Sequence, residues 1–344
     1  MRNLAGFFMS AKRSFSKPAL SIDEQIALLK RRGLSIPSDN EAKRFLQFVS
    51  YYRLSAYTFY YEKKNPDGTR THRFNDGVTF KDITDLYVFD SKLRKLLWEA
   101  TELIEIAFRT SLTYHLSLKY GAHWYTDKSL FDSYSYFNHD IFIEKLKKES
   151  GYGRHTGNHA HWGGEVFITH YYTNYDAPEL PPCWMMTEIT PLGSLSLLYS
   201  SLVKCADKQL IARDFGLDQK LFTSWIRSLS YMRNLCAHYC RVWNRVYKVN
   251  RPAEPKKLKK VGETNIFNPT KIHAFVVICA ILLKQINPKS VWEKRVCDLL
   301  VEYNLIPKRE MGFYDGWEND LNELEKKMFE SKSQTMGTTN ITPK

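Results

Sequence analysis

The longest uninterrupted pattern in this sequence is an amphipathic one that runs from Thr79 to about Tyr120. Thr79-Phe80-Lys81-Asp82 is typical of a helix start, and Gly121 stands where a helix would end. Between these signals, apolar side chains recur every three or four residues, at Leu86, Phe89, Leu93, Leu96, Leu97, Ala100, Leu103, Ile104 and Ala107. A helix with such a stripe must bury it against other elements, so the pattern predicts a mainly helical chain.

Further helix signals flank this segment on both sides. Ser21-Ile22-Asp23-Glu24 and Ser38-Asp39-Asn40-Glu41 are capping patterns, and Gly33 marks the end of the first helix. The turn signals Asn65–Gly68 and Asn75–Gly77 indicate a small hairpin between them. Glycines, histidines and prolines interrupt the pattern at about 150–182, which leaves a subdivision of the fold open there. Helical periodicity then returns at about 183–203, 206–215, 218–246, 268–286 and 289–303.

The composition points to a basic protein without a membrane span. The 50 Lys and Arg outnumber the 37 Asp and Glu, which gives a formal net charge of +13. Such a charge favours a polyanionic partner, with nucleic acid ahead of an anionic membrane surface. No run approaches the ~18 apolar residues of a spanning helix, and the N-terminus lacks the apolar core of a signal peptide. We therefore expect a cytoplasmic protein that does not bind membranes.

The six cysteines are scattered through apolar helical patterns, so we expect reduced, buried thiols. Cys236, His238 and Cys240 lie close together, but no second Cys/His pair at zinc-finger spacing accompanies them. We therefore predict neither a metal site nor a cofactor.

The segment from Leu221 to Tyr247 has two contrasting faces when it is placed on a helix. One face is apolar and consists of Trp225, Leu229, Met232, Cys236, Tyr239 and Trp243. The opposite face is polar and basic and consists of Arg227, Tyr231, Asn234, His238, Arg241 and Arg245, with Arg233 on its flank. An ordinary solvated face mixes acids and bases, yet no acid lies between Asp218 and Glu254. The unneutralised arginines are consistent with an anionic ligand such as an RNA phosphate.

The residue types on this face match the requirements of RNA cleavage. RNA supplies its own nucleophile, the 2′-hydroxyl. A histidine can act there as general acid or base, and an arginine can stabilise the charge that develops on the phosphate. Asn234 precedes His238 by four residues and can hydrogen-bond its ring. A purely structural histidine is the alternative interpretation of His238.

Several blocks of the sequence resemble those of a known family. Arg233-Asn234-Leu235-Cys236-Ala237-His238 is similar to the HEPN ribonuclease signature, in which a polar residue follows the arginine and a histidine comes one turn later. Its surroundings, Tyr231–Arg245, resemble the core block of the Abi family of abortive-infection proteins (the AbiD/AbiF-like group). Further blocks that match in order are Tyr51–Tyr57, Leu86–Arg94, Ile104–Thr110, Pro181–Met186 and Gly312–Trp317. The resemblance covers roughly residues 18–318.

The resemblance implies an all-α fold, a HEPN-like helical bundle with additional N- and C-terminal helices. We expect it to occupy residues 18–320, after a flexible N-terminus (1–17) and before a polar, partly disordered tail (321–344). It further implies defence against phage by a metal-independent endoribonuclease that leaves 2′,3′-cyclic phosphate ends and works as a homodimer. Arg233 and His238 would be the catalytic pair and Asn234 the positioning residue. A small noncoding RNA is a further expected partner.

Other residues are weaker candidates for the site. On the RNA-binding face we place Arg227, Tyr231, Arg241 and Arg245, and we add Arg53, whose neighbouring tyrosines could stack on bases or pack in a core. Glu105 could orient the catalytic arginine or simply pair with Arg109. Arg109 and His115 could form a second, degenerate motif. Two other functions stay open: an RNA-binding protein that does not cut, and a protein whose basic face meets an acidic protein partner.

Overall fold

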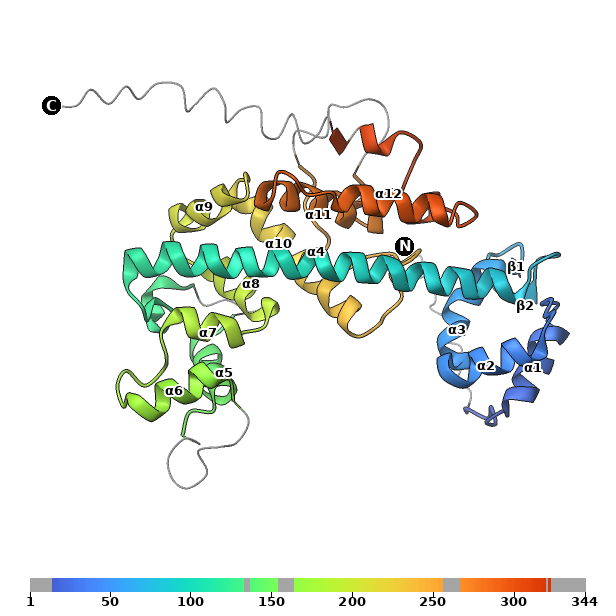
Figure 1. Ribbon diagram of the computed structural model, residues 1–344, viewed down its shortest axis with the longest axis horizontal. Helices are drawn as coiled ribbons and strands as arrows, with labels where there is room; N and C mark the ends of the chain where they lie inside the picture. The colour runs from blue at the N-terminus through green and yellow to red at the C-terminus, as the bar shows by residue number, and fades with distance from the viewer. Residues whose placement is uncertain (1–13, 133–136, 154–163, 256–266, 320, 323–344) are drawn as a thin grey trace, which may run out of the picture. The chain divides into compact units, whose positions relative to one another are not determined.

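The computed structural model describes residues 14–132, 137–153, 164–255, 267–319 and 321–322. Within them the fold is all-α apart from one small two-stranded sheet, as the sequence predicts (Figure 1). The chain forms two compact units, Met1–Val88 and Phe89–Lys344. The expected flexible N-terminus and polar tail lie almost entirely outside the described residues.

The first unit opens with three short helices: α1 (Ile22–Arg31), α2 (Asp39–Val49) and α3 (Tyr51–Thr58). The predicted capping box is present at α1, where the Ser21 hydroxyl accepts from Glu24 N–H and the Glu24 carboxylate accepts from Ser21 N–H. Ser38 caps α2 by accepting from Glu41 N–H.

The predicted hairpin exists, but it brackets the first turn signal instead of lying between the two. The strands β1 (Glu62–Lys64) and β2 (Arg70–Phe74) pair antiparallel across the turn Asn65–Gly68. Two turn residues, Asn65 and Gly68, close it through a main-chain hydrogen bond of 2.8 Å. A 3-10 turn, η1 (Phe59–Tyr61), leads into β1.

The helix predicted from the opening pattern is α4 (Phe80–Tyr120), 41 residues without a break. Thr79 and Asp82 cap its start reciprocally, since Asp82 accepts from Thr79 N–H at 2.8 Å and Thr79 accepts from Asp82 N–H at 3.3 Å. It ends where Gly121 adopts a φ of 88°. Its apolar stripe is buried through Leu86, Phe89, Leu93, Leu97, Ala100 and Ile104, whereas Leu103 is exposed.

The second unit surrounds the later part of α4 with further helices (Figure 1). They are α5 (His139–Ser150), α6 (Val166–Asn174), α7 (Cys183–Ile189), α8 (Leu192–Ser201), α9 (Cys205–Asp214), α10 (Gln219–Ala237), α11 (Ile272–Ile286) and α12 (Trp292–Glu302), with short 3-10 turns at Trp124–Thr126 (η2), Lys128–Leu130 (η3) and Arg309–Met311 (η5). Helix α10 packs against α8, α9 and α11, and Trp292 of α12 donates to Leu96 O of α4 at 2.9 Å.

Two helix predictions need correction, and two helices were not predicted. The stretch 183–203 forms two helices, α7 and α8, because Pro191 lacks the N–H that would continue α7 and instead is the N-cap residue of α8. The stretch 218–246 is helical only to Ala237. Helices α5 and α6 carry no pattern that the sequence analysis detected. No helix among the described residues is both long enough and apolar enough to cross a lipid bilayer.

Candidate functional site

Helix α10 is fixed by its buried face. Asp218 caps it by accepting from the N–H groups of Lys220 and Leu221 at 3.0 and 3.1 Å. The apolar stripe predicted on this helix is buried as far as the helix extends, at Trp225, Leu229, Met232 and Cys236. Burial also raises the pKa of the Cys236 thiol to about 12. The opposite side of α10 is therefore the side that can meet a ligand.

The helix ends at Ala237, nine residues before the end of the predicted helical stretch 218–246, and a tight turn follows at His238. The N–H of Tyr239 donates to Cys236 O at 3.0 Å, and that of Cys240 donates to Leu235 O at 2.9 Å. These are the two bonds of a Schellman motif, in which the residue after the cap turns into the left-handed region. Tyr239 occupies that position with a φ of 54°, where glycine is the usual residue. The prediction of a continuous helix to Tyr247 is therefore wrong.

A buried ion pair on α4 holds the chain that follows this turn. The carboxylate of Asp90 pairs with Arg94, and both side chains are almost fully buried. Its other oxygen accepts the N–H groups of Val242 and Trp243, at 3.1 and 2.6 Å. Arg94 in turn donates to Cys240 O at 3.5 Å. The segment after Tyr239 is thus held by hydrogen bonds at Cys240, Val242 and Trp243. These bonds also fix the position of His238 at the end of α10.

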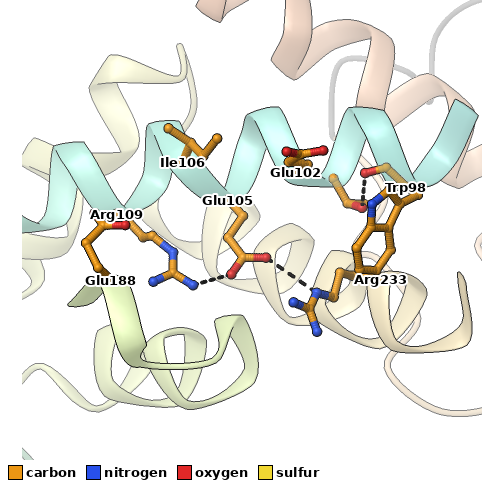
Figure 2. Close-up of a pocket in the computed structure, with 8 residues that line it drawn as sticks. Trp98, Glu102, Glu105, Ile106, Arg109, Glu188 and Arg233 are labelled. Carbon is orange, nitrogen blue, oxygen red and sulfur yellow. Dashed lines mark hydrogen bonds and ion pairs between the residues drawn. The ribbon is translucent and has the colours of Figure 1, made fainter. Parts of the chain in front are cut away.

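Arg233 lies one turn before the helix end and is held by two residues of α4. Its Nε lies 3.5 Å from Glu105 Oε2, and its guanidinium lies over the ring of Trp98, 5.1 Å from the centroid. Glu105 also pairs with Arg109, which donates to the carbonyl of Thr187. Figure 2 shows the Glu105 carboxylate between the two guanidinium groups. The Glu105 side chain is only 9% exposed, whereas that of Arg233 is 33% exposed and can reach a ligand.

Two hollows meet at Trp98. The first, which we call the Arg233 pocket, has a volume of about 320 Å³ and is lined by Trp98, Thr101, Glu102, Glu105, Ile106, Arg109, Glu188 and Arg233 (Figure 2). The second, the Tyr239 pocket, has a volume of about 360 Å³ and is lined by Ser91, Arg94, Lys95, Trp98, Cys236, Ala237 and Tyr239. The catalytic candidates Arg233 and His238 thus lie on or next to the walls of adjoining pockets.

The predicted positioning residue, Asn234, lies on the open side of α10. Asn234 and His238 are both exposed. In the described part of the chain, the hydrogen bond recorded between them is a main-chain one, from His238 N–H to Asn234 O at 3.0 Å. The side chains are therefore available to a ligand, and the amide is not seen to orient the ring.

The residues of the predicted RNA-binding face do not all lie on one helix. Arg227 and Tyr231 lie on α10 and are partly buried. Arg241 and Arg245 lie beyond the helix end, because the helix stops at Ala237. Arg241 donates to the carbonyls of Trp243 and Asn244, and Arg245 donates to Arg241 O at 3.2 Å. A single helical stripe of arginines is therefore absent from α10.

The remaining candidates have local roles. Arg53, in the first unit, lies over the ring of Tyr87 at 6.0 Å. Of the neighbouring tyrosines, Tyr57 packs in the core and Tyr52 is exposed. His115 Nε2 lies 2.9 Å from Asp214 Oδ2, and Arg109 pairs with Glu105. Among the residues that the structure describes, no three His, Cys, Asp or Glu side chains converge as metal ligands would.

Sequence reasoning missed Trp98, Asp90 and Arg94. Asp90 and Arg94 stand four residues apart inside one of the blocks that resemble the Abi family, which was a usable signal. Trp98 precedes Glu105 by two helical turns and so shares its face of α4. Nothing in the sequence links Trp98 to Arg233, because their contact joins α4 and α10, which lie far apart along the chain.

A comparison with known protein families gives a match. A family model described as Abi-like protein matches residues 44–244, which is more than half of the chain and includes α4, both pockets and α10. No curated protein and no solved structure is significantly similar to the chain.

Proposed function

The chain belongs to the Abi-like protein family, and from this premise we propose that it acts in abortive-infection defence against phage, as a metal-independent HEPN-type endoribonuclease. One observation carries the proposal. A partly exposed arginine, Arg233, is held by a buried carboxylate and an indole, while an exposed histidine, His238, stands five residues later at an anchored helix end. A pair of groups held in this way suits a reaction that needs fixed charge and a proton carrier.

The chemical roles follow from the residue types. The 2′-hydroxyl of the RNA loses its proton and attacks the adjacent phosphate, while the bond from phosphorus to the 5′-oxygen breaks and that oxygen gains a proton. His238 carries out one of these two proton transfers, and water carries out the other. The guanidinium of Arg233 stabilises the charge that develops on the phosphate oxygens. Asn234 binds the ribose or phosphate from the same exposed surface of α10. The products are a 2′,3′-cyclic phosphate and a 5′-hydroxyl.

The alternative function is an RNA-binding protein that holds a noncoding RNA without cutting it. The observation that favours it is the Arg233 pocket itself, where Glu105, Glu102 and Glu188 stand beside Arg233 and Arg109. Three carboxylates against two guanidinium groups limit the positive charge available to a phosphate there. Under this alternative, the net charge of +13 still provides RNA affinity.

We also propose that the active form is a homodimer, with α4 at the interface. Exposed apolar side chains follow one side of α4, at Leu103, Ile106, Tyr114 and Leu118. They are arranged almost symmetrically about Thr110, so two copies of the helix crossing there antiparallel would match Ile106 with Tyr114. Ile106 also lines the Arg233 pocket, so such a dimer would bring a second copy to the site.

Cleavage with a chelator present tests the nuclease proposal. The purified chain is incubated with mixed single-stranded RNA and EDTA, and the product ends are identified by their sensitivity to phosphatase and kinase. We expect cyclic phosphates from the unmodified chain. His238→Ala and Arg233→Ala should each lower the rate by about 100-fold or more. His170→Ala, which removes another exposed histidine, is the matched control and should cleave normally.

The outcomes separate the two functions. Intact RNA that remains bound would replace the nuclease with the non-cleaving binder. RNA that is neither bound nor cut at moderate salt would refute both. For the dimer, light scattering of Ile106→Glu/Leu118→Glu should give a monomer, whereas the control Val166→Glu, at an exposed residue of α6, should not change the mass. An unmodified chain that is monomeric and still cleaves would contradict the dimer proposal.

A further inference from the structure

The Tyr239 pocket differs in charge from the adjoining Arg233 pocket. Its seven described lining residues include two cations, Arg94 and Lys95, and no carboxylate. Arg94 is buried and paired with Asp90, so the exposed ammonium of Lys95 is the cation that faces solvent. An anionic or acceptor-rich ligand is therefore favoured on this side of Trp98 over the Arg233 side, where three carboxylates stand.

Aromatic side chains stand on two walls of the Tyr239 pocket. Trp98 is 36% exposed and Tyr239 is 69% exposed, which are high values for rings of this size. Cys236 forms part of the floor, and because its pKa is raised to about 12 it stays an uncharged thiol. The hollow thus offers aromatic faces, a neutral floor and a cation at its edge. The volume of about 360 Å³ is large enough for a heterocyclic base with its sugar.

The backbone conformation of Tyr239 supports a ligand-binding role for its ring. A left-handed φ of 54° disfavours every residue with a Cβ, and the same turn would form more readily with glycine. Strained backbone of this kind is typical of ligand-binding positions.

We propose that the Tyr239 pocket is a base-binding subsite, in which one nucleobase of single-stranded RNA stacks on Tyr239 and Trp98. Lys95 contacts the phosphate that adjoins this base, and the Ser91 hydroxyl, which also lines the pocket, hydrogen-bonds the base edge. The chain of the RNA then passes Trp98 toward Arg233, with His238 next to the nucleotide that the subsite holds. This inference rests on the proposed function only in that RNA is the ligand.

Binding of a short RNA tests the subsite without any need for cleavage. The probe is a six-nucleotide RNA with one 2-aminopurine, a base whose fluorescence is quenched by stacking, and it is titrated into the full chain carrying His238→Ala. Tyr239→Gly should weaken binding about tenfold and remove the quenching, since one stacked base contributes on that order. The same substitution should raise or preserve the thermal midpoint, because glycine suits the φ. Trp98→Ala should also weaken binding, although it additionally removes a contact to Arg233.

The controls remove exposed rings elsewhere in the second unit. Trp184→Ala and Tyr175→Ala should leave affinity and quenching unchanged. If Tyr239→Gly binds the probe as tightly as its parent, or if the controls weaken binding equally, the subsite does not exist. A ribonucleoside monophosphate that binds as tightly as the hexamer would overturn RNA as the ligand.

The cleavage assay distinguishes the two failures. Normal binding and cleavage by the Tyr239→Gly chain would remove the subsite and leave the nuclease standing. Tyr239-dependent binding by a chain that never cuts RNA would keep the subsite and remove the nuclease.

Discussion

The carboxylate of Glu105 lies 3.5 Å from Nε of Arg233 and on its other side pairs with Arg109. One buried negative charge thus holds two guanidinium groups, from α4 and α10. Glu105 by itself offsets one of these two positive charges, and Glu102 and Glu188 line the same pocket. Of the two guanidinium groups, that of Arg233 is the more exposed. Glu105 is therefore placed to set the direction of the arginine that the proposed reaction uses.

Glu105→Gln should weaken both stability and cleavage. The amide keeps the shape but leaves Arg109 and Arg233 without a counter-charge, which should lower the free energy of unfolding by about 2 kcal/mol. Arg233 loses its orientation, so kcat should fall about tenfold or more while KM changes little. Urea denaturation and steady-state cleavage measure the two effects. Glu102→Gln, an exposed carboxylate on the wall of the same pocket, should change neither, and equal effects from both variants would contradict the assignment.

Asp90→Asn should destabilise the protein and release the segment that follows Tyr239. The substitution leaves buried Arg94 uncompensated and weakens the acceptor for Val242 and Trp243, so we expect a loss of about 3 kcal/mol or more. Amide hydrogen exchange should rise first in the segment after Tyr239, before global unfolding. The control is Asp85→Asn, which removes an exposed pair with Lys81 on the same helix and should cost at most about 0.5 kcal/mol. Unchanged exchange after Tyr239 would show that the ion pair does not anchor it.

Stability should depend on His273 as the pH falls. This side chain of α11 is buried among the rings of Phe313, Tyr314 and Trp317, and burial lowers its pKa from 6.5 to about 4. Between these values the unfolded chain binds a proton that the folded chain does not. Folding stability is therefore complete above pH 6.5 and decreases by about 3 kcal/mol as the pH falls to 4.

His273→Leu should remove that part of the pH dependence. Urea midpoints of the two chains, measured from pH 7 to pH 4.5, should diverge in slope, with the leucine variant less sensitive to acid. Parallel curves would mean that folding does not lower the pKa of His273.

The thiols should differ in reactivity. Cys236 has a pKa of about 12, so at pH 8 only about one thiol in ten thousand is ionised, and Cys205 is exposed. Iodoacetamide should therefore label Cys205 of the native chain long before Cys236, with mass spectrometry as the readout. Urea should abolish the difference. Rapid native labelling of Cys236 would mean that the floor of the Tyr239 pocket opens in solution.

The sequence predicted the helices whose start and end signals are local. The caps at Ser21, Ser38 and Thr79 and the end at Gly121 all formed, because each depends on residues three or four positions apart. The end of α10 was missed because it is made by main-chain hydrogen bonds and by a tyrosine in a left-handed turn. No glycine or proline there marks the end of the helix, and the apolar periodicity continues past it to Trp243. Trp243 is buried although it lies outside α10.

The sequence predicted several residues of the candidate site but not the contacts between them. Arg233, His238 and Glu105 were identified from spacing and resemblance, and the structure brings Glu105 to Arg233. The aromatic contact of Trp98 and the anchoring by Asp90 were not predicted, because they depend on which turn of α4 meets α10. That registration is set by packing between helices, for which a single sequence carries no direct signal.

Helix α4 carries the anchor at Asp90 and the arginine holder at Glu105 on one unbroken rod. Fifteen helical steps separate them, a span of about 22 Å in which each added residue rotates all that follows by about 100°. Single side chains along this span can be substituted, but the number of residues between Asp90 and Glu105 cannot change without moving Glu105 to another face of the helix. A single insertion after Leu96 would turn Glu105 away from α10 while leaving Asp90 in place, so this stretch should resist changes in length far more than changes in composition.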